Sequence, residues 1–220
     1  MLPEGNVPES IPHYEIAEQI RAVLAAWAEG LDRPVRLARN LAIRWLERLP
    51  QIGIDPDVCV LDPAPPDADT LVSLCLWKPG HFAPSLCFEV VSANHPHKDY
   101  KDVHERYAAV GARELVVFDP FLLGPASLGG PMRFQLWRTD ACGAFERVAT
   151  GDGPVYSEVL GCWLSASDRE LVFSNDRAGR ERWQSREERE RTEKERERAE
   201  KERALARVEE LETRLGKTTD

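Results

Sequence analysis

The chain has 220 residues, of which 42% are hydrophobic and 30% are charged, a balance that suits one globular domain with an accessory segment. No apolar run reaches the roughly 18 residues that a membrane-spanning helix needs, and the first residues lack the basic start and apolar core of a secretion signal. Five cysteines without a CxxC pair favour small buried side chains in a reducing compartment over disulfides or a zinc site, so we expect a cytoplasmic location.

The net charge of −9 is unevenly distributed along the chain. From Asp176 on, 14 basic and 14 acidic side chains balance, so residues 1–175 hold 15 basic and 24 acidic residues and carry the whole excess of acid. Nucleic-acid binders usually present a basic surface, because neutralising phosphates supplies much of the affinity. The acidic body therefore counts against strong non-specific DNA binding, while a local basic groove is compatible with it.

The N-terminal quarter of the chain has helical spacing. Apolar residues from Ile16 to Trp27 recur on one face and predict a helix over residues 14–30. A second apolar pattern over residues 41–49 predicts another short helix. The period then changes to two over residues 57–60, which indicates a strand.

The middle of the chain reads as strand, helix, strand. Residues 84–92 form a nearly continuous apolar run, as in a strand covered on both faces. Residues 99–110 place an apolar stripe at helical spacing, closed by Gly111, and residues 113–120 are again rich in β-formers. A parallel crossover unit is the natural arrangement, and the short strands over residues 132–174 predict an antiparallel extension.

The C-terminal segment is dense in charge. Between Arg180 and Gly216 it contains no proline and no other glycine, and Glu is often followed by Lys or Arg four residues later. Apolar heptad positions appear only late, at Ala204, Val208, Leu211 and Leu215. We expect a long solvated helix whose last turns can form a dimer seam, with contact to nucleic acid as the alternative.

Two acids stand out against the apolar strands. Asp57 opens one strand, and Glu89 lies inside another, on the same face as Cys87 and Val91. If these strands are neighbours, the two carboxylates converge, and a divalent cation would remove the cost of burying them. The alternative is structural: Asp57 caps a turn after Pro56, and Glu89 pairs with an arginine.

The order of these motifs resembles the putative restriction endonuclease family of the PD-(D/E)XK nuclease superfamily. The resemblance covers about residues 50–215, and it is carried by Pro56-Asp57, Glu89 to Ser92, Asp99, Tyr107, Gly111 and Glu114 to Pro120. It implies a restriction-endonuclease-like core and hydrolysis of phosphodiester bonds with Mg²⁺ or Mn²⁺. It also implies that the metal ligands are the Asp57 and Glu89 carboxylates and the backbone carbonyl of Val90.

The chain departs from the family at the catalytic lysine. In the superfamily this residue stands two positions after the glutamate, here Val91, and in the family it usually stands on the following helix, here Val103. Lys98 precedes the predicted helix and can reach the site on its four-carbon stem, so it is our candidate for the catalytic lysine. Lys101 is the alternative, although it lies about 200° around the helix axis from Val103 and should point away. Asp99 is expected to cap the helix, with support of the metal or the lysine as the alternative.

Two histidines, His95 and His97, follow the strand on a polar loop. With no third ligand evident, side chains facing solvent are the favoured interpretation, and a metal or base role is the alternative. The sequence contains no Gly-rich phosphate loop and no GxSxG nucleophile motif.

We therefore expect an α/β fold with a restriction-endonuclease-like mixed sheet flanked by helices, an antiparallel extension and a long charged C-terminal helix. The predicted nuclease domain spans residues 10–175, and residues 176–220 form the tail. The expected function is metal-dependent cleavage of DNA, with a possible homodimer through residues 180–215 and no membrane association. The alternative is a nuclease-fold interaction module that has lost the chemistry and associates through its C-terminal helix.

Overall fold

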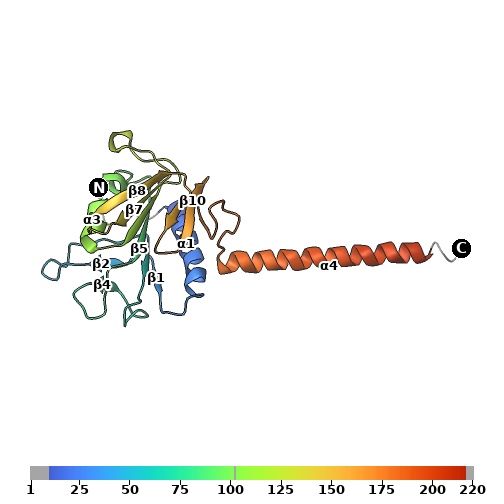
Figure 1. Cartoon of the computed structure of the whole chain (residues 1–220). Helices are drawn as coiled ribbons and strands as arrows, with labels where there is room; N and C mark the ends of the chain where they lie inside the picture. The colour runs from blue at the N-terminus through green and yellow to red at the C-terminus, as the bar shows by residue number, and fades with distance from the viewer. Residues whose placement is uncertain (1–9, 102, 217–220) are drawn as a thin grey trace. The chain divides into compact units, whose positions relative to one another are not determined.

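The structure is a computed structural model that describes residues 10–101 and 103–216, apart from the side chains at 209, 210 and 212–216. These residues form two compact units, divided between Trp183 and Gln184. The first unit is a mixed α/β fold, and the second contains one long helix (Figure 1). The predicted fold class is confirmed.

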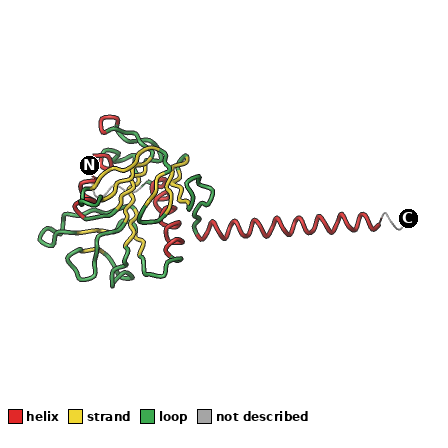
Figure 2. The backbone as a smooth tube through the Cα atoms, in the orientation of Figure 1, coloured by secondary structure: helices red, strands yellow, loops and turns green. Residues whose placement is uncertain are grey.

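Strands, drawn in yellow in Figure 2, run through the centre of the first unit. Six of them form a mixed sheet with strand order β1-β3-β5-β6-β7-β8. Its strands are β1 (Arg36–Ala38), β3 (Val58–Leu61), β5 (Leu86–Val90), β6 (Glu114–Phe118), β7 (Phe134–Thr139) and β8 (Phe145–Gly151). Strands β5 and β6 run parallel, while the other neighbouring pairs are antiparallel. The helices α2 (Lys98–Lys101) and α3 (Val103–Val110) lie between β5 and β6 in the chain, so the predicted crossover is confirmed.

Two smaller sheets accompany the central one. Strands β9 (Val155–Ser157), β10 (Cys162–Ser167) and β11 (Glu170–Ser174) form an antiparallel sheet, in agreement with the predicted extension. Strands β2 (Ala42–Arg44) and β4 (Ser73–Cys75) pair in parallel. A 3₁₀ turn, η2 (Ala126–Leu128), interrupts the loop after β6.

The helix predicted over residues 41–49 is wrong. Residues Ala42–Arg44 form β2 instead. Ile43 in this strand and Leu41 just before it are buried, while Leu46 and Leu49 beyond its end are exposed. Pairing with β4, about 30 residues away in the chain, and the bridge between Ile43 and Ile54 satisfy this backbone. Long-range pairing therefore overrode a weak local helical pattern.

The central sheet is buried on both faces. The helix α1 (Ile11–Ala28) and strands β9–β11 cover one face, and α3 with the β2–β4 pair covers the other. Within β5, Phe88 and Val90 point to the first face and Cys87 to the second, as strand alternation requires. The predicted first helix is confirmed, with its start at Ile11 rather than residue 14.

The five cysteines are all free. Cys59, Cys87 and Cys162 are buried as small apolar side chains, whereas Cys142 is exposed.

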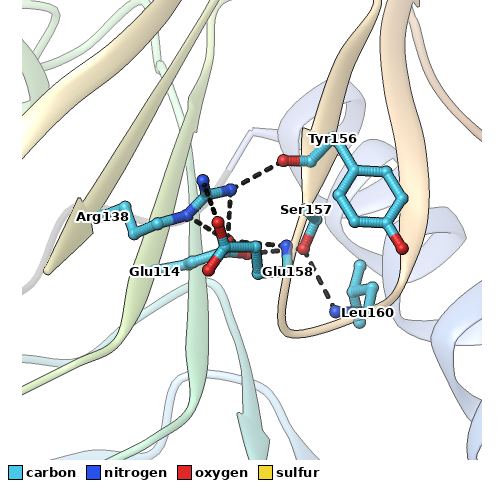
Figure 3. A network of polar contacts seen from close by, with 6 residues as sticks. All are labelled: Glu114, Arg138, Tyr156, Ser157, Glu158 and Leu160. Carbon is cyan, nitrogen blue, oxygen red and sulfur yellow. Dashed lines mark hydrogen bonds and ion pairs between the residues drawn. The ribbon is translucent and has the colours of Figure 1, made fainter. Parts of the chain in front are cut away.

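A buried carboxylate ties the central sheet to the antiparallel extension (Figure 3). Glu114 on β6 accepts hydrogen bonds from Arg138 Nε on β7 at 2.8 Å, from the Ser157 hydroxyl and from the Glu158 backbone N–H at 2.9 Å. Arg138 also donates to the Tyr156 carbonyl at 2.7 Å. The sequence offered no role for Glu114, because its partners come from strands that are distant in the chain.

The second unit contains α4 (Arg186–Gly216). A capping box begins the helix: the Glu188 N–H donates to Ser185 Oγ at 3.2 Å, and the Ser185 N–H donates to Glu188 Oε2 at 2.7 Å. Leu205, Val208 and Leu211 are exposed along it. Within residues 10–101 and 103–216, no helix is both long and apolar enough to cross a membrane.

Candidate active site

Glu89 sits on the buried face of β5 that looks toward α3. It is only 4% exposed, and the Tyr107 hydroxyl on α3 donates a hydrogen bond of 2.6 Å to its Oε1. Burial, reinforced by the nearby charge of Asp57, raises the pKa of Glu89 well above its usual value, while Lys98 opposes the rise. The hydrogen bond that Glu89 accepts here comes from Tyr107.

A cavity of about 140 Å³ opens beside Glu89. Lys98 from α2 and Arg106 and Tyr107 from α3 contribute to its walls. Two acids, Asp55 and Glu89, and two cations, Lys98 and Arg106, line the cavity. This combination suits an anionic ligand that approaches together with a divalent cation.

Lys98 is the lysine that the fold brings to this cavity. The residue as a whole is exposed, but its side chain lines the cavity with Glu89, and the charge of Glu89 raises the pKa of Lys98 above its usual value. Lys101 is also exposed. Val91 and Val103, at the two usual lysine positions, are buried in the hydrophobic core on the α3 side of the sheet.

Asp57 lies immediately before β3 and is 8% exposed. Its Oδ2 accepts a hydrogen bond of 2.7 Å from the backbone N–H of Val90, the residue after Glu89. The antiparallel register between β3 and β5 pairs Val58 with Phe88, which brings the start of one strand to the end of the other. Asp57 and Glu89 therefore meet at one end of the sheet, near enough for the Asp57 charge to act on the Glu89 pKa.

His13 on α1 is a polar contact of this site that the sequence analysis missed. Its Nε2 lies 2.9 Å from the Val90 carbonyl oxygen and 3.2 Å from Asp57 Oδ2. A signal was present, since His13 precedes Ala17 and Ile20 at helical spacing on the face that α1 buries. A polar side chain on that face required a polar partner from elsewhere in the fold.

Asp99 lies in α2 as its second residue, so it does not take the capping position expected from the sequence. It is 4% exposed, and burial raises its pKa to about 7, with Lys98 lowering the pKa and Asp57 raising it. The charge of His13 also acts on Asp99. Asp99 is thus part of the same electrostatic cluster as the candidate site residues.

The donor atoms present fit a hard divalent cation in part. Within the described part of the chain, no three His, Cys, Asp or Glu side chains are grouped as a metal site. Two carboxylates, Asp57 and Glu89, and the carbonyl of Val90 do gather at one sheet end, and such oxygen donors suit Mg²⁺ or Mn²⁺ completed by waters. Burial first and the charge of Asp57 second raise the pKa of Glu89, and a cation bound beside both carboxylates would favour their charged forms.

Two comparisons with known proteins found a match. Residues 4–124 match the model of a family described as "Putative restriction endonuclease", named Uma2. A solved structure of a putative nuclease from Anabaena variabilis ATCC 29413 is similar to the chain, with 14% identity, a TM-score of 0.48, and coverage of 70% of this chain and 75% of that one. No protein with curated annotation matches.

Proposed function

Because the chain belongs to the Uma2 family of putative restriction endonucleases, we propose that it is a divalent-metal-dependent endonuclease that hydrolyses DNA phosphodiester bonds. The observation that carries the proposal is the pairing of Glu89 with Lys98 in one cavity. The chain has valine at both usual lysine positions, and Lys98 on α2 would take the role of the catalytic lysine.

Asp57, Glu89 and the Val90 carbonyl would hold Mg²⁺ or Mn²⁺. A bound ion of this kind lowers the pKa of a coordinated water and stabilises negative charge on a phosphodiester under attack. The resting protein keeps the Glu89 carboxyl oriented through the Tyr107 hydroxyl at 2.6 Å. It keeps Asp57 in place through the Val90 N–H at 2.7 Å.

Lys98 acts as the cation that faces the substrate. The charge of Glu89 raises its pKa, so its amine stays protonated at neutral pH and can neutralise a phosphate oxygen. Arg106 lines the same cavity and adds positive charge. These two cations give the acidic body a local surface suited to DNA.

A cleavage assay with Mg²⁺ or Mn²⁺ on plasmid and linear DNA tests the proposal. The wild type should cleave, Glu89→Ala should abolish cleavage, and Glu105→Gln, which alters an exposed acid on α3, should leave the rate unchanged. Melting curves of each variant confirm folding. Cleavage that survives Glu89→Ala would mean that the site lies elsewhere, and no cleavage by the wild type across metals and substrates would favour the inactive interaction module.

The proposal also includes a homodimer formed through the C-terminal helix and a cytoplasmic location. Val208 and Leu211, two of the four predicted heptad positions, are exposed on α4 and would contribute to the seam of a homodimer through residues 180–215. Ala204 is also exposed, and the side chain of Leu215 lies outside the described part of the chain. Five free cysteines are compatible with a reducing compartment such as the cytoplasm.

A further inference from the structure

A tyrosine on the same short helix as Lys98 is held by the loop that follows β6. The helix α2 has four residues, and a helix of little more than one turn depends on contacts with the rest of the fold for its position. Tyr100 comes two residues after Lys98, which places the two side chains about 200° apart around the helix axis. Lys98 therefore faces the cavity from one side of the turn, and Tyr100 leaves from the other side.

The Tyr100 hydroxyl joins α2 to both ends of the loop between β6 and β7. The Met132 N–H donates to this hydroxyl at 2.9 Å, and its own proton is shared between Asp119 Oδ2 and the Met132 carbonyl oxygen, each 3.0 Å away. Asp119 is fully buried, and it also accepts hydrogen bonds of 2.8 Å from the backbone N–H groups of Leu123 and Gly124. The partners of the hydroxyl are thus themselves fixed by the loop.

Two glycines of this loop make room for the Tyr100 ring. A Cβ atom at Gly130 would lie 2.8 Å from Tyr100 Cε1, and one at Gly124 would overlap the hydroxyl end of the ring. Carbon atoms in contact prefer a separation of about 3.5–4.0 Å, so a side chain at either position would displace the ring. The loop therefore fits the ring closely and restricts rotation of α2 about its axis.

Resting on the proposed function, we propose that Tyr100 is a positioning residue: its hydroxyl contacts hold α2 so that the Lys98 amine stays in the cavity beside Glu89. Lys98 has a flexible four-carbon stem, so the direction in which this stem leaves the backbone decides where the amine meets a phosphate. A misplacement of about 1 Å in an active site can cost on the order of 10²-fold in rate.

The first test observes Lys98 in the wild type without substrate. The chain has six lysines, so labelling lysine with ¹³C at Cε gives few signals, and Lys98→Arg and Lys101→Arg identify the two on α2. Relaxation of ¹³C should show that Lys98 Cε is more ordered on the picosecond-to-nanosecond timescale than Lys101 Cε, which is exposed on the same helix. A Lys98 side chain as mobile as that of Lys101 would overturn the inference, and this result needs no variant of Tyr100.

Tyr100→Phe then removes the hydroxyl and keeps the ring that the two glycines surround. Lys98 Cε should become as mobile as Lys101 Cε, and in DNA cleavage kcat should fall about tenfold or more while KM stays within about twofold. Tyr156→Phe is the matched control, because Tyr156 is 42% exposed on β9, and it should leave both readouts unchanged. If Tyr100→Phe lowers kcat while Lys98 keeps its order, the positioning role is refuted.

The relaxation measurement does not depend on cleavage, so the two proposals fail separately. A wild type that cleaves no DNA, with Lys98 losing its order in Tyr100→Phe, would reject the nuclease and keep the role of Tyr100 in placing Lys98. Cleavage that Tyr100→Phe leaves at the wild-type rate would reject the positioning role and keep the nuclease.

Discussion

Replacing Glu114 by alanine tests whether the buried carboxylate between the two sheets stabilises the fold. The side chain is 1% exposed, and Arg138, the Ser157 hydroxyl and the Glu158 N–H all donate to it. After Glu114→Ala, the Ser157 and Glu158 donors lose their acceptor inside the protein. Arg138 keeps the exposed Glu158 carboxylate, at 2.7 Å, as its remaining ion-pair partner.

The expected loss is about 3–5 kcal/mol, the usual effect of removing one member of a buried ion pair. For a unit of this size each kcal/mol lowers the melting temperature by about 2–4 °C, so we expect a fall of roughly 10 °C. The assay is thermal unfolding followed by circular dichroism, with urea unfolding as a check. Glu158→Gln is the control, because it removes the charge of the other ion-pair partner of Arg138. The Glu158 side chain is 61% exposed, so this change should lower the free energy of unfolding by at most about 1 kcal/mol. If both variants melt within about 3 °C of each other, the reasoning about the buried network is refuted.

Three further predictions concern the site and the tail. Lys98→Met should slow DNA cleavage on the order of 10²–10³-fold, while Lys101→Met should stay within about twofold of wild type, and equal losses in single-turnover assays would contradict the role of Lys98. Burial raises the pKa of Asp99 from 3.8 to about 7, so the metal-free folded state holds this proton more tightly than the unfolded chain, and stability should fall as pH rises from about 4 to about 7. In Asp99→Asn, the difference between the free energies of unfolding in urea at pH 5 and pH 8 should be smaller than in the wild type. A variant with the same pH dependence as the wild type would count against the raised pKa of Asp99. A chain ending after Trp183 should keep the melting temperature of the first unit and elute as a monomer, and a monomeric full-length chain in light scattering would exclude the dimer.

Much of the fold could be predicted because its signals are local. The strand at residues 84–92, the helix that ends at Gly111 and the strand at residues 113–120 each carry a period that a few neighbouring residues define. Alternation alone placed Glu89 on the face of Cys87 and Val91, and the structure buries both of these on the α3 side. The helix predicted over residues 41–49 was wrong because the signal that decides this segment is not local: β2 forms through its pairing with β4.

The candidate site was also predictable only in part. The sequence by itself determined which acids stand out, because Asp57 and Glu89 interrupt apolar strands and burial of a carboxylate is costly in any fold. Only the tertiary structure decided which side chains surround these two acids. His13 from the first helix lies beside Asp57 and Val90, and the Tyr107 hydroxyl donates a hydrogen bond to Glu89. Lys98 lines the cavity beside Glu89, although the strand itself carries no lysine. These three neighbours come from three separate helices, α1, α2 and α3, and contact between distant segments is set by how helices and strands pack, which no local period records.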